Sequence, residues 1–317
     1  MAQRPNILLI LSDQHNPHIL GCAGDGIVRT PNLDRLAARG VLFVNTYCPS
    51  PLCVPSRMAF LTSRHCSDIR VWSNGCILSS EVPTFVHGLG AAGYEAILCG
   101  RMHFTGPDQR HGFHRRLIGD VDPSLGHIPL ATTGQTKIAV EVAGPGRTAY
   151  TAYDDAVTQT CCEFLRERAR VKSERPFFMV VGYVLPHCPY ICPKRLFDEY
   201  YDQVDVPQLP PGYLDRLHPA VKAWRRRRGV DELTDDQIRT ARAAYYGLVT
   251  YMDERIGEVL RTLEEVGSAE DTIVIYTSDH GDMAGEHRMW WKSNMYEGSI
   301  KVPLIISWPG TFPEGRQ

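Results

Sequence analysis

Short apolar runs without an alternating polar pattern constrain the fold of this chain more than any other feature. They are NILLILS (6–12), VLFVNTY (41–47), EAILCG (95–100), FFMVVGYV (177–184), DTIVIYTS (271–278) and PLIISWP (303–309). Runs of this kind indicate strands buried on both faces, which is typical of parallel sheets. Helical patterns lie between them, at 30–40, 83–93, 151–171 and 234–267. This alternation predicts an α/β fold with a mostly parallel central sheet and helices on both faces.

Local signals predict the ends of two of these helices. Thr30 is the expected N-cap of the first, with Pro31 in the first turn and Gly40 as the terminator. Thr234 is the expected cap of the long helix, which should end at Gly267. Two segments, 105–148 and 186–232, show no regular pattern, and their length favours lids or substrate walls over inert loops.

Bulk composition excludes several classes of function. A net charge of −2 and a pI of about 6.6 give no electrostatic reason to expect nucleic acid or a membrane as a partner. The arginine run 225–228 is interpreted as a solvated surface, with a local anion or partner site as the alternative. The first apolar run is too short to span a membrane and has no cleavage site after it, so we expect a cytoplasmic protein.

The spacing of the cysteines argues against several classes of metal-binding, redox and disulfide-rich protein. The ten cysteines form no CxxC pair, which argues against a zinc ribbon or a thioredoxin-like motif. A disulfide framework is not indicated for a chain of 317 residues. Nothing in the composition sets the oligomeric state, and a homo-oligomer is compatible with it.

Acidic and polar residues follow two of the predicted strands. Asp13 and Gln14 come after the first strand, and Asp279, His280 and Asp282 come after the fifth. Ligands gather at the carboxyl edge of parallel sheets, and two carboxylates can share that edge when a divalent cation offsets their repulsion. Carboxylate and amide oxygens favour Ca²⁺ or Mg²⁺ over zinc. The alternative is that each acid caps a loop or a helix.

The stretch SPLCVPSRMAF, residues 50–60, places Cys53 just before a predicted helix and four positions before Arg57. A nucleophilic cysteine is one interpretation. Phosphatase-type cysteine loops have more residues between cysteine and arginine, including glycine, so that class fits poorly. A thiolate is also an unsuitable ligand for a hard cation. An unmodified cysteine therefore does not explain this neighbourhood.

CVPSR followed by MAFLTSR resembles the signature of the type I, formylglycine-dependent sulfatases of the alkaline phosphatase-like superfamily. The resemblance extends through PNILLILSDQH, GRMHFTGPDQRHGF, YVLPHCPY, TIVIYTSDHGD and EGSIKVPLIISWPG, and is strongest to the choline sulfatase and arylsulfatase-like branch. It implies an alkaline phosphatase-like fold, with 1–317 as one catalytic domain. Because the chain stops directly after a predicted strand, we expect the small C-terminal subdomain to be absent or truncated.

The resemblance also implies an activity. Cys53 would be oxidised to formylglycine by a formylglycine-generating enzyme, and the hydrated aldehyde would attack the sulfur of an aryl or alkyl sulfate. The second hydroxyl of the diol would then expel sulfate, a step that a thiol cannot perform. The implied cofactor is a divalent cation, with Ca²⁺ favoured and Mg²⁺ or Mn²⁺ as alternatives.

The resemblance also implies roles for single residues, according to their positions in the matching motifs. The implied metal ligands are Asp13, Gln14, Cys53, Asp279 and His280, and the implied catalytic residues are Cys53, Arg57, His103, His187 and Lys292. Weaker candidates for substrate binding are Arg101, Asn74 and His127. Within these sets, His103 matches a base, His187 a general acid, and Lys292 a sulfate-binding residue. Two alternatives remain: a phosphonate monoester or phosphodiester hydrolase, and a non-catalytic anion-binding relative.

Overall fold

The central feature of the computed structural model, which describes residues 4–121 and 134–317, is a seven-stranded sheet. Its strand order is β2-β9-β8-β1-β6-β3-β4. The strands are β1 (Asn6–Asp13), β2 (Val41–Leu42), β3 (Glu95–Gly100), β4 (Arg115–Ile118), β6 (Phe177–Pro186), β8 (Thr272–Ser278) and β9 (Leu304–Ser307). The neighbours from β8 to β4 are parallel, and β9 runs antiparallel to both of its neighbours, β8 and β2. The predicted mostly parallel sheet is confirmed.

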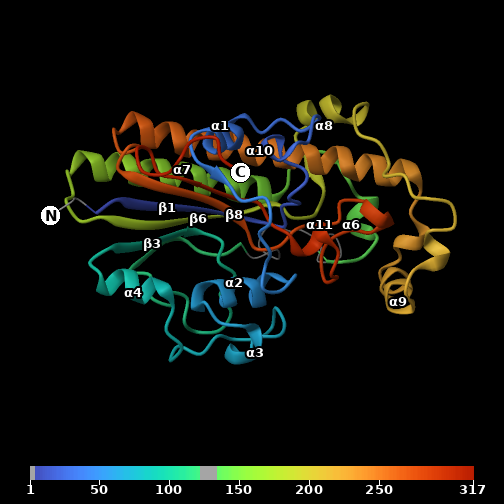
Figure 1. Cartoon of the computed structure of the whole chain (residues 1–317), viewed down its shortest axis with the longest axis horizontal. Coiled ribbons are helices and arrows are strands. Elements are labelled where there is room, and N and C mark those ends of the chain that lie inside the picture. The colour runs from blue at the N-terminus through green and yellow to red at the C-terminus, as the bar shows by residue number, and fades with distance from the viewer. Residues whose placement is uncertain (1–3, 122–133) are drawn as a thin grey trace.

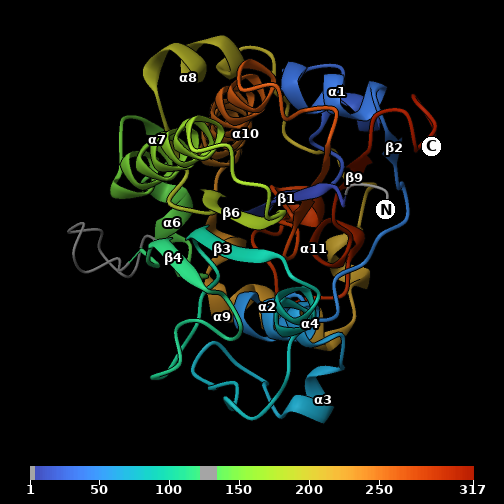
Figure 2. The ribbon, with the colours of Figure 1, turned by 90° about the vertical axis from the view of Figure 1, so that its left-hand side faces the viewer.

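Helices cover both faces of the sheet, as Figures 1 and 2 show. On one face lie α1 (Pro31–Ala38), α7 (Ala149–Arg170), α8 (Lys194–Tyr201) and α10 (Asp235–Glu265). On the other lie α2 (Cys53–Thr62), α3 (Cys66–Ile69) and α4 (Phe85–Ala91). Beyond the carboxyl ends of the strands lie α6 (Ile138–Glu141), α9 (Pro219–Arg228) and α11 (Glu297–Ile300). A small second sheet pairs β5 (Gly144–Pro145) with β7 (Ile191–Cys192).

Two apolar clusters hold these layers together. One joins the sheet to α7 and α10, and the other joins it to α2 and α4. All ten residues of β6 are buried, which explains why its sequence has no polar alternation. The Thr234 capping box begins α10, and Gly267, with φ of 70°, follows its end as predicted.

Strand register sets the position of the acidic residues. Ser12 on β1 pairs with Ser278 on β8, so Asp13 and Asp279 emerge side by side at the carboxyl edge. On the other side of β1, Asp13 pairs with Pro186 after an irregularity in the ladder. Gly182 allows β3 to approach closely, since a Cβ there would lie 2.0 Å from the carbonyl oxygen of Arg101.

Several details differ from the sequence prediction. The strand expected over 41–47 covers only Val41–Leu42, because Phe43, Val44 and Tyr47 are 43–50% exposed and have left the sheet. An extra strand, β4, pairs with β3 inside the segment expected to be irregular. Its short sequence RRLI is too polar to be recognised as a buried strand.

The second irregular segment contains two helices, α8 and α9, that the sequence reading did not predict. Pro193 precedes α8, Pro219 begins α9 and α9 carries the arginine run, so both helices lie in Pro- and Arg-rich sequence that was expected to be irregular. Thr30 is the N-cap residue of α1 as predicted, but its side chain makes no capping hydrogen bond. Its hydroxyl instead donates to Asp34 and accepts from the Gly21 amide.

None of the helices in the described part of the chain is long and apolar enough to cross a membrane. The cytoplasmic location stays a prediction.

Candidate active site

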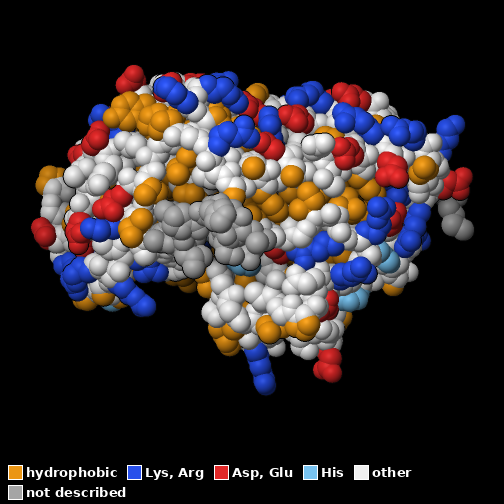
Figure 3. Space-filling model, turned by 180° about the vertical axis from the view of Figure 1, so that it is seen from behind, with side chains coloured by type: hydrophobic (Ala, Val, Ile, Leu, Met, Phe, Trp, Pro, Cys, Tyr) orange, Lys and Arg blue, Asp and Glu red, His pale blue; other side chains and the backbone are white. Residues whose placement is uncertain are grey.

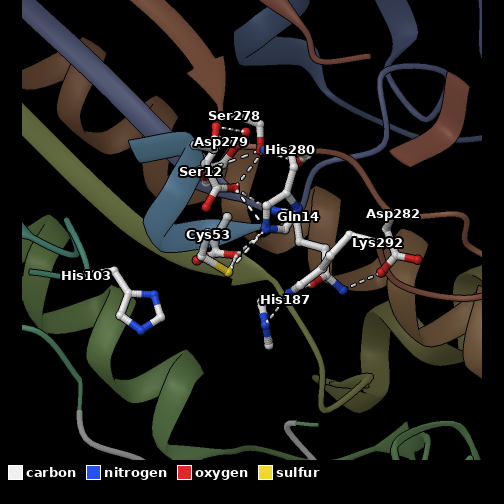
Figure 4. A network of polar contacts seen from close by, with 12 residues as sticks. Ser12, Gln14, Cys53, His103, His187, Ser278, Asp279, His280, Asp282 and Lys292 are labelled. Carbon is white, nitrogen blue, oxygen red and sulfur yellow. Dashed lines mark hydrogen bonds and ion pairs between the residues drawn. The ribbon is translucent and has the colours of Figure 1, made fainter. Parts of the chain in front are cut away.

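Four buried side chains from three separate segments converge at the carboxyl edge of the sheet. Ligand atoms of Asp13, Cys53, Asp279 and His280 all lie within 4.8 Å of one another. The Cys53 sulfur lies 3.2 Å from His280 Nε2 and 3.8 Å from Asp13 Oδ1. Figure 4 shows Cys53, at the start of α2, lying beside Asp279 and His280 from the segment after β8.

Two arginines orient the carboxylates of this cluster. Arg57 donates to Oδ2 of Asp13 at 3.1 Å and to Oδ2 of Asp279 at 2.8 Å, and Arg101 donates to Oδ2 of Asp13 at 2.6 Å. The Oδ1 atoms of Asp13 and Asp279 lie 3.8 and 3.6 Å from His280 Nε2, and Oδ1 of Asp279 also accepts from the backbone amides of residues 14 and 280. Burial opposes the charged form of Asp13, but Arg101 and Arg57 outweigh it and hold the pKa of Asp13 well below its usual value. Both the charge and the direction of the carboxylates suit a cation.

His280 presents a lone pair to the same point. Its Nδ1 contacts the carbonyl oxygen of Gly281 at 3.0 Å, and because a carbonyl only accepts, the ring proton sits on Nδ1. Burial lowers the pKa of His280, which keeps the ring neutral. Neutral imidazole with a fixed tautomer is a metal ligand. The donor set of two carboxylate oxygens, one ring nitrogen and the group at position 53 therefore fits a divalent cation.

Gln14 and Lys292 form the adjoining side of the site. Lys292 Nζ donates to Gln14 Oε1, and both side chains are buried. Burial alone would lower the pKa of Lys292, but Cys53 and Asp13 raise it, so the ammonium is retained. Gln14 therefore turns its oxygen toward a cationic group beside the cluster.

His187 contacts the same ammonium. Its Nε2 lies 2.8 Å from Lys292 Nζ, and its Nδ1 lies 2.7 Å from the carbonyl oxygen of Cys188. The Nδ1 proton is therefore donated to the carbonyl, and Nε2 accepts from Lys292. Lys292 is the group within reach that can supply a proton to Nε2 of His187.

His103 lies on the other side of Cys53 from Lys292 (Figure 4). Its Nδ1 accepts from Arg101 Nη2 at 2.9 Å, and Asp120 holds its backbone amide at 2.9 Å. Burial, reinforced by Arg101, lowers the pKa of His103 to about 2, so the ring is neutral. With Arg101 engaging Nδ1, the ring proton sits on Nε2, and His103 acts as a base only if Arg101 moves away.

The structure places two of the three weaker candidates for substrate binding, Arg101 and Asn74, close to the cluster or to α2. Arg101 belongs to the carboxylate network beside the cluster. Asn74 lies at the start of α2, where its Oδ1 accepts from the Val54 amide at 3.0 Å. His127 lies outside the described residues.

Two positioning acids had no role in the sequence prediction. Asp282 is fully buried and contacts Gln14, Tyr190 and the backbone of Trp291. Asp120 bonds the amides of Met102 and His103 and so fixes the turn that carries His103. The position of Asp282, three residues after Asp279, was the available signal, whereas nothing near Asp120 in the sequence singles it out.

The family model described as Sulfatase matches residues 5–317. The chain belongs to the sulfatase family. It is 36% identical to a choline-sulfatase of Rhizobium meliloti over 98% of this chain and 64% of that protein. It is 30% identical to an arylsulfatase of Clostridium perfringens over 99% of this chain and 70% of that protein. The predicted family and branch are confirmed.

A solved structure, a phosphonate monoester hydrolase of Agrobacterium radiobacter, superposes with a TM-score of 0.77 and is 26% identical over 99% of this chain and 70% of its own. The alkaline phosphatase-like α/β fold expected from the sequence is thereby confirmed. The chain spans less than two thirds of the length of the choline-sulfatase.

Proposed function

We propose that this protein hydrolyses aryl or alkyl sulfate esters, with formylglycine formed from Cys53 as the nucleophile and a divalent cation beside it. The observation that carries the proposal is the place of the Cys53 sulfur, within 4.8 Å of the ligand atoms of Asp13, Asp279 and His280. An oxygen of the hydrated formylglycine would take the place of that sulfur and replace a soft ligand by a hard one. We propose Ca²⁺ as the cation, with Mg²⁺ and Mn²⁺ as alternatives.

The bound cation would supply charge to activate that oxygen and to stabilise the sulfuryl group. The chain's own residues do the rest. Arg57 orients Asp13 and Asp279 and, with Arg101, keeps Asp13 charged. Lys292 binds a sulfate oxygen, and His187, taking its proton from Lys292, protonates the departing alcohol. His103, released by Arg101, accepts the proton in the elimination that frees sulfate.

A second candidate is hydrolysis of phosphonate monoesters or phosphodiesters at the same site. Two observations favour it: the similarity to a phosphonate monoester hydrolase, and Gln14, whose amide gives the cation one negative charge fewer than a carboxylate would. A less negative site tolerates the second charge of a phosphoryl transition state better. A non-catalytic relative is the remaining alternative.

The first experiment is the mass of the peptide that contains Cys53, after expression with and without a formylglycine-generating enzyme. We expect conversion of Cys53 to the aldehyde, together with sulfate release that depends on it. Active protein that still carries the thiol would contradict the mechanism. Cys53→Ala should have no turnover, and Cys53→Ser should stop after one turnover because a serine sulfate has no elimination route.

The second experiment compares steady-state rates on an aryl sulfate, an aryl phosphonate and an aryl phosphodiester with the same leaving group. The proposal expects the highest kcat/KM for the sulfate. Turnover of the phosphorus esters without turnover of the sulfate would replace the first function by the second.

A further inference from the structure

Arg228, the last residue of α9, is a half-buried cation held by uncharged groups. Its guanidinium carbon lies 4.1 Å from the ring centroid of Trp224. Its Nε and Nη2 donate to Oε1 of Gln135 at 3.3 and 3.2 Å. Arg225, on the same helix, forms an ion pair with Asp231 at 2.7 Å, whereas Arg228 has no carboxylate partner among the ion pairs of residues 4–121 and 134–317.

A chain of hydrogen bonds ties Arg228 to the active site. Gln135 Nε2 donates to Oγ of Ser293 at 3.0 Å, and Trp224 Nε1 donates to the carbonyl oxygen of Ser293 at 3.0 Å. Ser293 follows Lys292 directly, and its amide donates to the carbonyl oxygen of Pro51 at 3.1 Å, two residues before Cys53. Arg228 is thus fixed, through one intervening glutamine, to the segment that carries the sulfate-binding lysine.

The surface around α9 is consistent with an approach route for an anion. Seen from behind, the molecule is hollowed along its lower edge, and Lys and Arg side chains gather on the lobe to the left of the hollow (Figure 3). This lobe is the end of the molecule where α9 lies in Figure 1. The other side of the hollow is the lobe that contains α2 and α3, and α2 begins at Cys53.

Partial burial of an unpaired cation has a cost that a ligand can offset. Burial, with a smaller contribution from Arg227, lowers the pKa of Arg228 to about 10, so the side chain is charged at neutral pH but destabilised. The indole ring offsets part of this through a cation–π contact. The planar fork of a guanidinium matches the two oxygens of a carboxylate or a sulfate.

We propose that Arg228, held against Trp224 and Gln135, binds a second oxyanion on the sulfate ester, so that the preferred substrates carry a carboxylate or a further sulfate besides the scissile one. This inference rests on the proposed function and names the substrate class of the same site. The solvated surface predicted for the arginine run holds for Arg226 and Arg227 but is wrong for Arg225, which is buried, and the inference gives Arg228 a binding role.

The test is binding of two aryl sulfates that differ only in a ring carboxylate or a carboxamide. Protein expressed without the converting enzyme keeps the Cys53 thiol, so affinity can be measured by calorimetry without turnover. We expect the carboxylated ester to bind about tenfold more tightly, which corresponds to about 1.4 kcal/mol. Arg228→Gln should lower the affinity for the carboxylated ester to about that for the carboxamide and so remove this difference.

Arg226→Gln is the matched control, since Arg226 is exposed on the same helix, and it should preserve the tenfold preference. The preference of the wild-type protein should also weaken as salt concentration rises, which tests the inference even if Arg228→Gln does not fold. Equal affinity for the two esters, or equal effects of both substitutions, would overturn it. Failure of the proposed function is seen separately, as absence of sulfate release by converted protein.

Discussion

The carboxylate of Asp282 accepts a hydrogen bond from the side-chain amide nitrogen of Gln14, and this contact fixes which way the amide faces. Both side chains are fully buried. Asp282 Oδ2 also accepts from the hydroxyl of Tyr190 at 2.7 Å, and its Oδ1 accepts from the backbone of Ala284 and Trp291. Since a carboxylate can only accept, the amide oxygen of Gln14 must point the other way, toward Lys292.

Gln14→Glu should destabilise the protein, because it places a second carboxylate against buried Asp282. We expect the free energy of unfolding to fall by roughly 1–3 kcal/mol, the cost of leaving a buried polar group without a partner. Urea unfolding at pH 7 measures it.

The double variant Gln14→Glu with Asp282→Asn is the control for this pairing. The asparagine introduced at position 282 would keep its oxygen on the backbone amides and donate from its nitrogen to the glutamate introduced at position 14. We therefore expect the second substitution to recover more than half of the loss. Strictly additive losses from the two single substitutions would show that the two side chains are not coupled.

Arg57→Met should lower the free energy of unfolding more than any other single substitution in the site. Arg57 contacts Asp13 and Asp279, and all three side chains are fully buried, so its removal leaves two carboxylates without their shared cation. Breaking a buried pair in this way costs about 3–5 kcal/mol. Saturating Ca²⁺ should restore part of the stability, because a bound cation offsets the same charges.

Unfolding of Arg57→Met with excess chelator and with excess Ca²⁺ tests this expectation. Arg64→Met is the control, since Arg64 is exposed just beyond the end of α2 and should change stability by no more than about 0.5 kcal/mol. Stability of the Arg57 variant close to wild type in chelator would contradict the account.

The sequence was enough to predict the buried strands, because a strand that is buried on both faces needs apolar residues throughout. NILLILS and FFMVVGYV form neighbouring parallel strands, and the acids that follow two strands meet because parallel register brings strand ends together. The meeting of Asp13 and Asp279 was predictable from parallel strand register, whereas the place of Cys53 beside them was implied by the resemblance of CVPSR to the sulfatase signature.

What the sequence did not predict depends on contacts between distant segments. Asp282 acts through Gln14 and Tyr190, which are 268 and 92 residues away. The interaction of Arg101 with His103 depends on a left-handed backbone at His103, with φ of 60°, that no local pattern requires. Helix α9 is polar on most of its surface, and packing of Trp224 and Arg225 against the segment 287–293 stabilises it where apolar periodicity does not.

Removal of the divalent cation should lower the stability of the wild-type protein. A ligand that binds only the folded state stabilises it by about 2.7 kcal/mol at a concentration one hundred times its dissociation constant. Thermal unfolding in chelator and in increasing Ca²⁺ should therefore show a midpoint that rises with concentration. Asp279→Asn should shift that rise to higher Ca²⁺, because one charged ligand is lost.

Asp271→Asn is the matched control for the cation experiment, because Asp271 is exposed just before the amino end of β8, whereas Asp279 follows its carboxyl end. It should titrate like the wild type. A midpoint that does not depend on Ca²⁺, Mg²⁺ or Mn²⁺ would remove the metal assignment.

Asp154 should make stability fall as pH rises toward neutrality. It is fully buried on α7 and accepts from the amides of Val184 and Leu185, both at 2.9 Å, at the end of the strand that leads to His187. Burial, only partly offset by these hydrogen bonds, raises its pKa to about 7. The folded protein therefore binds a proton that the unfolded chain releases near pH 4, and stability is lost between that pH and about 7.

Asp154→Asn removes this titration and keeps an acceptor for one of the two amides, because Val184 and Leu185 bond different carboxylate oxygens; the comparison therefore concerns the pH dependence and not the absolute stability. The free energy of unfolding of the variant, taken relative to wild type, should rise by on the order of 4 kcal/mol as pH goes from about 4 to about 8. Each pKa unit contributes about 1.36 kcal/mol. Asp155→Asn is the control, because Asp155 pairs with Arg147 and Arg255 near the surface. The urea midpoints of the three proteins, measured at a series of pH values in this range, test whether the stability difference changes with pH. Parallel curves for wild type and Asp154→Asn would mean that Asp154 stays ionised and that the two backbone amides outweigh its burial.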